Sequence, residues 1–521
     1  MCEMRLLPEP QTRSKHLNFM NRILFTHSYF LRYDPKQWAA GQPYAPLGTL
    51  YAAALMRENG YDVSVYDTMF SETPQEVIPV LESYKPNFFV IYDDGFNYLT
   101  KMCLTNMREA AFQMIKLAKQ RGCTVIVSSS DSTDRFEEYL NQGADFILIG
   151  EGEMTLLELI NEIINKQNDL LSTQGIAFKH PIAGEGTVKA VTKTARRAVI
   201  RDLDSLPFPA WDLIDVEPYR KMWARNKGFF SMNMGTTRGC PFKCNWCAKP
   251  IYGNRYNSRS PENVVSELKM LKEKFHFDHI WFCDDIFGLK PGWVHDFADL
   301  IEKEKLNFRF KIQARADLLL QEEYIKDLAR AGCENAWMGA ESGSQKILDA
   351  MDKGTTVSQI YEATRLLKEH GIHPSFFIQF GYLGETKDDI KKTIRMINEL
   401  LPHEIGISVS YPLPGTLFYE KVKSDLKEKT NWTDSDELAL MFRNTYQPAF
   451  YKQLYRYVHK TYRTHIALEN IKSIARRPLA ITNKSLKKAV SFIYYAPAAI
   501  VARQRLSRLE KNSFAWAALT S

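Results

Sequence analysis

Several features that stabilise other classes of protein are scarce in this sequence of 521 residues. It has eight cysteines, and a disulfide framework does not suit so long a chain. Internal repeats and low-complexity tracts are absent. No signal-peptide pattern opens the chain, so we expect a reducing, cytoplasmic compartment. The length and the 45% hydrophobic content predict two or three globular domains.

The net charge of +7 is small, but it is unevenly distributed. Residues 451–521 contain fourteen lysines and arginines and two acidic residues, which gives +12 there and −5 over the rest. Within this tail a short apolar run, residues 489–502, lies between basic flanks and is too short to span a bilayer. We expect an interfacial helix on an anionic membrane; a packed helix with a solvated basic face is the alternative. No RNA-binding module is recognised, so we do not expect a nucleic-acid partner.

Three cysteines within eight residues, Cys240, Cys244 and Cys247, are the strongest chemical signal. Three thiolates can ligate three irons of a cubane cluster and leave the fourth iron without a protein ligand. A structural zinc site closes four positions, and no second cysteine pair follows here. A redox dithiol needs only two cysteines. Zinc and a disulfide remain the weaker alternatives, and we interpret the other five cysteines as buried apolar residues.

The first part of the chain alternates short apolar runs with helical patterns. Because each run is closed by turn or polar residues, residues 22–175 predict an α/β domain with a doubly wound parallel sheet. Its ligand is expected beyond the carboxyl ends of the strands. The predicted strands are residues 23–25, 63–66, 88–92, 125–127 and 146–149.

A polar connector, residues 176–225, leads into a second strand-helix series over residues 226–416, followed by a helical, basic region over residues 417–521. Polar residues follow the strands of the second series, as in a parallel barrel with ligands at its carboxyl rim. Each of them taken singly could be a helix cap or a surface ion pair. The polar residues are Asp284, Asp285, Arg315, Glu341, Glu385 and Tyr411, and Gly381 begins the loop that leads to Glu385.

The spacing Cys-x3-Cys-x2-Cys resembles the signature of the radical S-adenosylmethionine (radical SAM) superfamily. Residues 248–262 resemble the post-cluster loop of its cobalamin-dependent members, which include class B methyltransferases and the anaerobic magnesium-protoporphyrin IX monomethyl ester oxidative cyclase. Residues 44–55 and 59–63 resemble the opening of the cobalamin-binding domain fused to such enzymes. The resemblance covers residues 22–415. It implies a Rossmann-like cobalamin-binding domain followed by a partial TIM-type barrel.

The resemblance also implies roles for individual residues. Cys240, Cys244 and Cys247 would hold a [4Fe-4S] cluster, whose open iron binds S-adenosylmethionine. Asp284 or Asp285 would meet its amino group, Arg315 its carboxylate and Glu341 its ribose, while residues 381–385 with Tyr411 would meet the adenine. Leu383 stands where many relatives have proline. The corrin of cobalamin would be lined by residues 27–29, 46–49, 92–94, 128–131 and 150–153, among them Pro46, Gly48, Ser129, Gly150, Glu151 and Gly152.

One departure concerns the cobalt. Residues 27–32 lack the Asp-x-His-x-x-Gly pattern of proteins that bind cobalamin with its base displaced. We therefore expect no histidine ligand from this chain, and His27 is interpreted as a strand-end residue. A response-regulator-like or nucleotide-binding sheet is the alternative for this domain, because a doubly wound fold does not itself determine a ligand.

The implied function is reductive cleavage of S-adenosylmethionine, with methylation of an unactivated carbon in a lipid, tetrapyrrole or natural product. A low-potential electron donor such as flavodoxin or ferredoxin would be its partner. Radical oxidation or ring closure without methyl transfer, and a non-catalytic corrinoid-binding protein, are the alternatives. No residue can be assigned to substrate proton transfer from the sequence.

Overall fold

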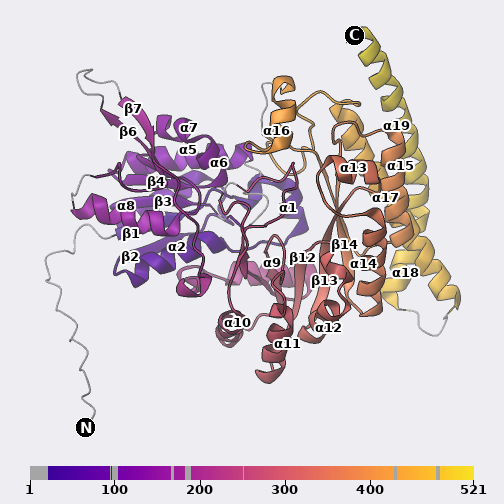
Figure 1. Ribbon diagram of the computed structural model, residues 1–521, viewed down its shortest axis with the longest axis horizontal. Helices are drawn as coiled ribbons and strands as arrows, with labels where there is room; N and C mark the ends of the chain where they lie inside the picture. Colours follow the sequence, from indigo (N-terminus) through magenta and orange to yellow (C-terminus); the bar gives the residue numbers. More distant parts are fainter. Residues whose placement is uncertain are drawn as a thin grey trace.

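The computed structural model describes residues 22–93, 95–96, 104–165, 169–181, 189–249, 251–426, 431–476 and 482–520. Two sheets with their helices lie next to each other, and a group of C-terminal helices covers the far side of the second one (Figure 1). Some sequence predictions lie outside the described residues. They are the burial of Cys2 and Cys103, Asp94 as a lining residue, a loose lead-in over residues 1–20, expected from its lack of periodicity, and a hairpin tip at residues 184–186, expected from its two glycines.

The first sheet has the strand order β2-β1-β3-β4-β5-β6-β7. Its first five strands are parallel, and all five lie where the sequence predicts strands. The chain reverses its direction of winding between β1 and β3, which places the switch point there. β6 and β7, from the predicted connector, extend the sheet in antiparallel fashion. The strands are β1 (Arg22–Thr26), β2 (Asp62–Tyr66), β3 (Phe88–Tyr92), β4 (Thr124–Ser128), β5 (Phe146–Leu148), β6 (Ile176–Pro181) and β7 (Lys189–Lys193).

Helices cover both faces of this sheet, because its central strands bury side chains on both sides. One apolar cluster joins the strands to α2 (Leu47–Glu58) and α8 (Glu153–Asn165). The other joins them to α3 (Ile78–Tyr84), α5 (Thr105–Lys119) and α7 (Phe136–Asn141). The short helices α1 (Pro35–Ala40) and α6 (Ser130–Asp134) follow strand ends. The predicted doubly wound domain is confirmed.

The second sheet has six parallel strands in chain order, β8-β11-β12-β13-β14-β15. Helices follow these strands on the outside, so the sheet is the predicted partial barrel. The strands are β8 (Ser231–Met234), β11 (His279–Phe282), β12 (Arg309–Ala314), β13 (Cys333–Glu341), β14 (His373–Phe380) and β15 (Ile405–Val409). The helices are α9 (Glu217–Lys227), α10 (Pro261–Phe275), α11 (Trp293–Lys303), α12 (Glu322–Ala331), α13 (Gln345–Ala350), α14 (Val357–Glu369), α15 (Lys387–Leu400) and α16 (Leu417–Val422).

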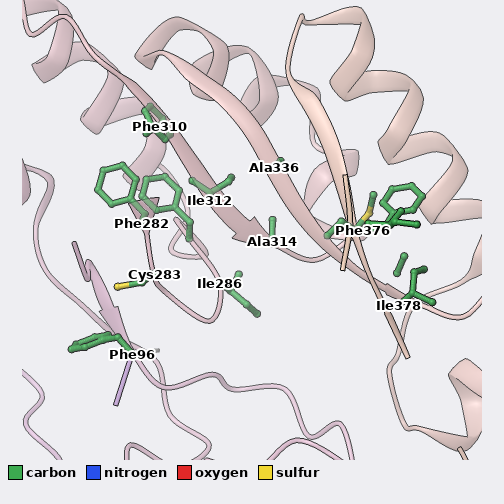
Figure 2. Packing of buried hydrophobic residues seen from close by; sticks show 14 of the residues in the cluster. Phe96, Phe282, Cys283, Ile286, Phe310, Ile312, Ala314, Ala336, Phe376 and Ile378 are labelled. Atoms are coloured by element: carbon green, nitrogen blue, oxygen red, sulfur yellow. The ribbon is translucent and has the colours of Figure 1, made fainter. Parts of the chain in front are cut away.

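Side chains of the second sheet alternate between a helix-covered outer face and the inner face of the barrel. Figure 2 shows outer-face residues such as Phe282, Phe310 and Ile312, which are fully buried. Residues between them along the strands, such as Lys311, are only partly buried. The outer face is therefore the hydrophobic core, and the inner face is available for polar chemistry.

Three helices complete the chain: α17 (Pro448–Arg476), α18 (Asn483–Val490) and α19 (Phe492–Thr520). α17 and α19 pack side by side, and α17 contacts α15 of the barrel. Lys387 of α15 also forms an ion pair with Glu510 of α19 at 2.8 Å. None of the helices in the described ranges is both long and apolar enough to cross a bilayer.

Candidate active site

The three cysteines lie on a loop that a small two-stranded ladder closes. β9 (Thr237–Arg238) pairs in antiparallel fashion with β10 (Asn257–Ser258), so the described residues between them, 239–249 and 251–256, belong to a loop at the carboxyl end of β8. Gly239 has a φ of +82°, and a Cβ at this position would lie 2.3 Å from the carbonyl oxygen of Arg255. Only glycine fits here, because both the conformation and the close approach exclude a side chain.

The cysteine thiols are partly buried and free of disulfides. Within the part of the chain that the structure describes, no three His, Cys, Asp or Glu side chains converge on one point, as a mononuclear zinc site would require. In a cubane cluster each thiolate binds a different iron, so its ligands need not converge. Cations lie close by: Nη1 of Arg315 is 4.0 Å from Sγ of Cys244, and Lys249 donates to the backbone of the loop at Phe242. These residues fit an anionic iron-sulfur cluster.

Asn245, between two of the cysteines, anchors the loop to the barrel. Its side chain donates to the carbonyl oxygen of Ala350 at 2.8 Å and to Oδ2 of Asp352 at 2.7 Å, and it accepts from the hydroxyl of Tyr382 at 2.8 Å. It is buried. Sequence reasoning missed this residue, because an asparagine inside a ligand motif has no periodicity that reports its partners.

The two predicted aspartates have different surroundings. Asp284 is buried and accepts hydrogen bonds from the amide of Thr236, the hydroxyl of Thr236 and the amide of Thr237, at 2.7, 2.5 and 2.8 Å. Burial raises the pKa of Asp284 to about 6. It therefore holds the chain segment that leads to the cysteine loop. Asp285 is exposed, and its charge acts on the thiol of Cys240. Of the two, Asp285 has the side chain that a solvent-borne ligand can reach.

Arg315, predicted to pair with a carboxylate, lies at the cluster loop. Its guanidinium lies 3.7 Å from the ring centroid of Phe242, and its Nε and Nη2 donate to Asp317 at 2.9 and 3.0 Å. Nη1 is directed toward Cys244. The salt bridge occupies the Nε–Nη2 edge of Arg315 and, together with the ring, fixes the orientation of its guanidinium beside the cysteines, where its charge suits an anion. Its contact with the methionyl carboxylate stays a prediction.

Glu341, predicted to bind a ribose, is paired with a residue that the sequence analysis missed. Nζ of Lys353 lies 2.8 Å from its Oε1, and both side chains are almost fully buried. The Lys353 ammonium also lies 5.9 Å from the ring centroid of Trp246. Glu341 itself has a φ of +54°, a conformation that costs energy for a non-glycine residue. The ion pair of Glu341 and Lys353 thus lies beside the cysteine loop.

The predicted adenine loop is covered by the C-terminal region. Glu385 is buried and accepts from the amide of Gly381 at 2.7 Å, and burial raises the pKa of Glu385 to about 8. The side chain of Asn444 donates to the carbonyl oxygen of Gly381. The hydroxyl of Tyr411 accepts from Asn431 and from the amide of Trp432, at 3.1 Å each. These residues lie together at the carboxyl rim, and their contact with adenine stays a prediction.

The inner face of the barrel carries an aromatic and cationic surface below this rim. Nζ of Lys311 lies 5.1 Å from the ring of Tyr44 and 5.0 Å from the ring of Trp281, and burial lowers the pKa of Lys311 to about 8. The rings of Trp337 and Phe377 stack at a centroid distance of 4.7 Å. The strand pattern alone did not single out these residues.

The predicted corrin-lining residues lie at the carboxyl edge of the first sheet. Pro46 and Gly48 begin α2 near the switch point. Ser129 follows β4 and caps α6, since its hydroxyl accepts from the amide of Ser132 at 2.8 Å. Gly150, Glu151 and Gly152 follow β5. The structure brings these residues to one edge, and their contact with a corrin stays a prediction.

A buried arginine connects this edge to the cysteine loop. Arg238, two residues before Cys240, donates to Oε1 of Glu151 at 2.5 Å and to Oε1 of Glu153 at 2.8 Å. All three side chains are at most 5% exposed. The two domains are therefore joined by an internal ion triad. The guanidinium of Arg238 also lies over the rings of Tyr51, Phe96 and Tyr252, at 5.4, 5.9 and 5.3 Å.

One small cavity lies between the domains. It holds about 10 Å³ beside Arg238 and Arg259, so it is far smaller than a corrin. A larger hollow of about 650 Å³ lies at the opposite, amino-terminal edge of the first sheet, where doubly wound folds do not bind ligands. His27, next to the predicted corrin edge, bonds to Asp67 at 2.8 Å and is buried, as expected of a strand-end residue.

Comparisons with known proteins agree with this geometry. The radical SAM superfamily model matches residues 234–397. An uncharacterized methyltransferase of Pyrococcus horikoshii is 27% identical over 74% of this chain and 80% of its own length. The anaerobic magnesium-protoporphyrin IX monomethyl ester cyclase of Rubrivivax gelatinosus is 26% identical over 77% of this chain and 70% of its own length.

Two solved structures share the fold over most of the chain. The cobalamin-dependent S-adenosylmethionine radical enzyme OxsB, with aqua-cobalamin bound, aligns with a TM-score of 0.69 and 17% identity over 94% of this chain and 73% of its own. The radical S-adenosylmethionine methyltransferase TsrM from Kitasatospora setae, with cobalamin and a [4Fe-4S] cluster bound, aligns with a TM-score of 0.63 and 18% identity over 78% of each chain. This protein is therefore an enzyme with a radical SAM domain over residues 234–397, and it has the fold of these two cobalamin-binding enzymes.

Proposed function

We propose that this protein holds a [4Fe-4S] cluster through Cys240, Cys244 and Cys247, cleaves S-adenosylmethionine reductively, and uses cobalamin to methylate an unactivated carbon. The observation that carries the proposal is the loop with three cysteines, none of them in a disulfide, at the carboxyl rim of the partial barrel, with Arg315 beside it. The cluster supplies an electron and an open iron for the sulfonium donor. The names of the relatives and the fold of TsrM and OxsB support methyl transfer and cobalamin.

The residues of this chain position the donor. Arg315, held by Asp317 and Phe242, offers its guanidinium to the carboxylate of the donor. Asp285 offers an exposed carboxylate to its amino group. Asp284, Asn245 and Gly239 keep the loop in place. Preorganisation of this kind lowers the barrier, because the charged groups need not rearrange during the reaction.

The small cavity beside Arg238 does not itself accommodate a corrin. It holds about 10 Å³, and the guanidinium of Arg238 lies 5.9 Å from the ring centroid of Phe96. A corrin at this position would displace contacts such as that between Phe96 and Tyr252, whose ring centroids are 5.8 Å apart. The predicted lining at Pro46, Gly48, Ser129 and residues 150–152 remains part of the proposal.

The test begins with anaerobic purification and reconstitution with iron and sulfide. We expect about four irons per chain, cobalt after incubation with cobalamin, and 5′-deoxyadenosine after dithionite reduction in the presence of S-adenosylmethionine. Cys244→Ala should abolish 5′-deoxyadenosine formation. Cys123→Ala, which removes a buried cysteine of the N-terminal domain, is the matched control and should keep it. Formation by Cys244→Ala at the wild-type rate would refute the cluster assignment, and failure of the wild type would favour a non-catalytic corrinoid protein.

The second candidate is radical oxidation or ring closure without methyl transfer. The similarity to the magnesium-protoporphyrin IX monomethyl ester cyclase favours it. Methyl-labelled S-adenosylmethionine distinguishes methyl transfer from oxidation. The labelled compound is given to the reduced enzyme together with an extract of cells that lack the protein. Label in a product supports methylation, whereas a product that changes mass without label supports oxidation. A lipid, a tetrapyrrole or a natural product is proposed as the substrate class, and flavodoxin or ferredoxin as the electron donor.

A further inference from the structure

The C-terminal helices expose an unusual set of large apolar side chains. Along α18 and the first part of α19 these residues are spaced by three or four positions up to Tyr494, and Ile500 and Val501 follow seven positions after Ile493 and Tyr494. Spacings of three, four and seven place residues on one side of a helix, so they form one stripe on a nearly continuous helical surface. Exposure of this extent on adjacent turns marks an interaction surface. The members of the stripe are Leu486, Val490, Ile493, Tyr494, Ile500 and Val501, which are between 45% and 75% exposed.

The stripe faces outward because the opposite side of α19 is docked. Ala502 is 2% exposed, and its carbonyl oxygen accepts from the side chain of Gln453 of α17 at 3.0 Å. Leu506 and Leu509 pack against the main core. One apolar face of α19 thus packs against the rest of the protein, whereas the stripe contacts no other part of the described structure closely enough to be buried. α18 and α19 lie at the outer edge of the molecule, on the side away from the first sheet (Figure 1).

Basic residues surround the stripe. Lys487 and Lys488 are exposed on α18, and Arg503, Arg505 and Arg508 are exposed on α19. Glu510, further along α19, is paired with Lys387. The charge beside the apolar surface is therefore strongly positive. A second copy of this chain would bring like charges together, which disfavours self-association through this face.

We propose that α18 and the amino-terminal part of α19 form a docking surface for an anionic lipid bilayer, with the apolar stripe in the interface and the basic residues at the lipid headgroups. The combination of apolar side chains with flanking lysines and arginines is what an interfacial helix requires. The helices lie on the membrane and do not cross it. The surface is independent of the cysteine loop, so it stands whether or not the proposed reaction is correct.

The test uses the full-length protein and sedimentation with vesicles of phosphatidylcholine, either alone or mixed with phosphatidylglycerol. We expect pelleting with the anionic vesicles, weakening as salt is raised. Lys487→Gln with Lys488→Gln should reduce the partition coefficient about tenfold or more, and Ile493→Glu with Ile500→Glu should abolish pelleting. Leu171→Glu is the matched control, because Leu171 is a 68% exposed leucine of the N-terminal domain; its pelleting should equal that of the wild type. Circular dichroism checks that each variant is folded.

Three outcomes would overturn the proposal. The first is wild-type protein that stays in the supernatant with anionic vesicles at low salt. The second is pelleting of the Ile493→Glu, Ile500→Glu variant at the wild-type level. The third is a wild-type dimer in gel filtration that this variant converts to a monomer, with no vesicle binding, which would assign the face to a second copy of the chain.

Discussion

Replacing Arg238 with methionine tests the connection between the two domains. Methionine keeps much of the volume of the side chain and removes its charge. It leaves the carboxylates of Glu151 and Glu153 buried without their cation, and these carboxylates lie at the edge of the first sheet. Because an uncompensated buried charge is the main cost of breaking such a pair, Arg238→Met should lower the free energy of unfolding by about 3–5 kcal/mol.

The pH dependence of this loss follows from the carboxylates. Burial, together with the charge of Glu153, raises the pKa of Glu151, while Arg238 opposes this rise. Without Arg238 the pKa of Glu151 rises further, and a carboxyl whose pKa is raised in the folded state stabilises the fold at low pH and loses that contribution as pH rises. The deficit of Arg238→Met should therefore be smaller at about pH 5 than at about pH 8.

Urea denaturation, followed by circular dichroism, measures the effect. Arg238→Met with Glu151→Gln and Glu153→Gln should recover most of the loss, because neutral amides no longer need a cation. Arg57→Met is the control: it breaks the pair with Asp212, whose members are 43% and 44% exposed, and should cost at most about 1 kcal/mol. A loss for Arg238→Met no larger than that of Arg57→Met, or a triple variant no more stable than the single one, would refute the reasoning.

Three further predictions concern the rim. The pKa of Glu385 is raised in the fold from its ordinary 4.5 to about 8, so the free energy of unfolding should fall as pH rises from about 5 to about 8. Glu385→Gln should make this fall smaller in urea titrations at several pH values. An unchanged pH dependence of the free energy of unfolding would contradict the raised pKa of Glu385. Gly239→Ala should cost about 1–3 kcal/mol and lower the iron content after reconstitution, because its Cβ meets Arg255; full iron binding with unchanged stability would count against it. Lys353→Met should lower the free energy of unfolding by about 3–5 kcal/mol, because the buried carboxylate of Glu341 loses its cation. Adding Glu341→Gln should restore most of this free energy. Thermal and urea denaturation compare the two variants, and a double variant no more stable than Lys353→Met would contradict the prediction.

Local pattern explains why so much of the fold could be predicted. Apolar runs closed by turn residues indicate strands whatever their neighbours are, so both sheets were found from the sequence. The connector was harder, because β6 and β7 mix apolar with charged residues, and they join the first sheet through pairing of β6 with β5 and of β7 with β6. Burial of Cys123, Cys283 and Cys333 also agrees with the prediction, since thiols without ligand spacing are usually core residues.

The sequence by itself determined the chemistry that depends on spacing along the chain: three thiols within one loop, and a polar residue after each of several strands. The tertiary structure decided which of those polar residues are committed to other groups. Asp284 is held by amides 48 and 47 residues away, Glu341 by a lysine 12 residues away, and Glu151 by an arginine 87 residues away. The physical reason is that periodicity records which face a side chain occupies, whereas its partner across the fold is chosen only when distant segments pack together.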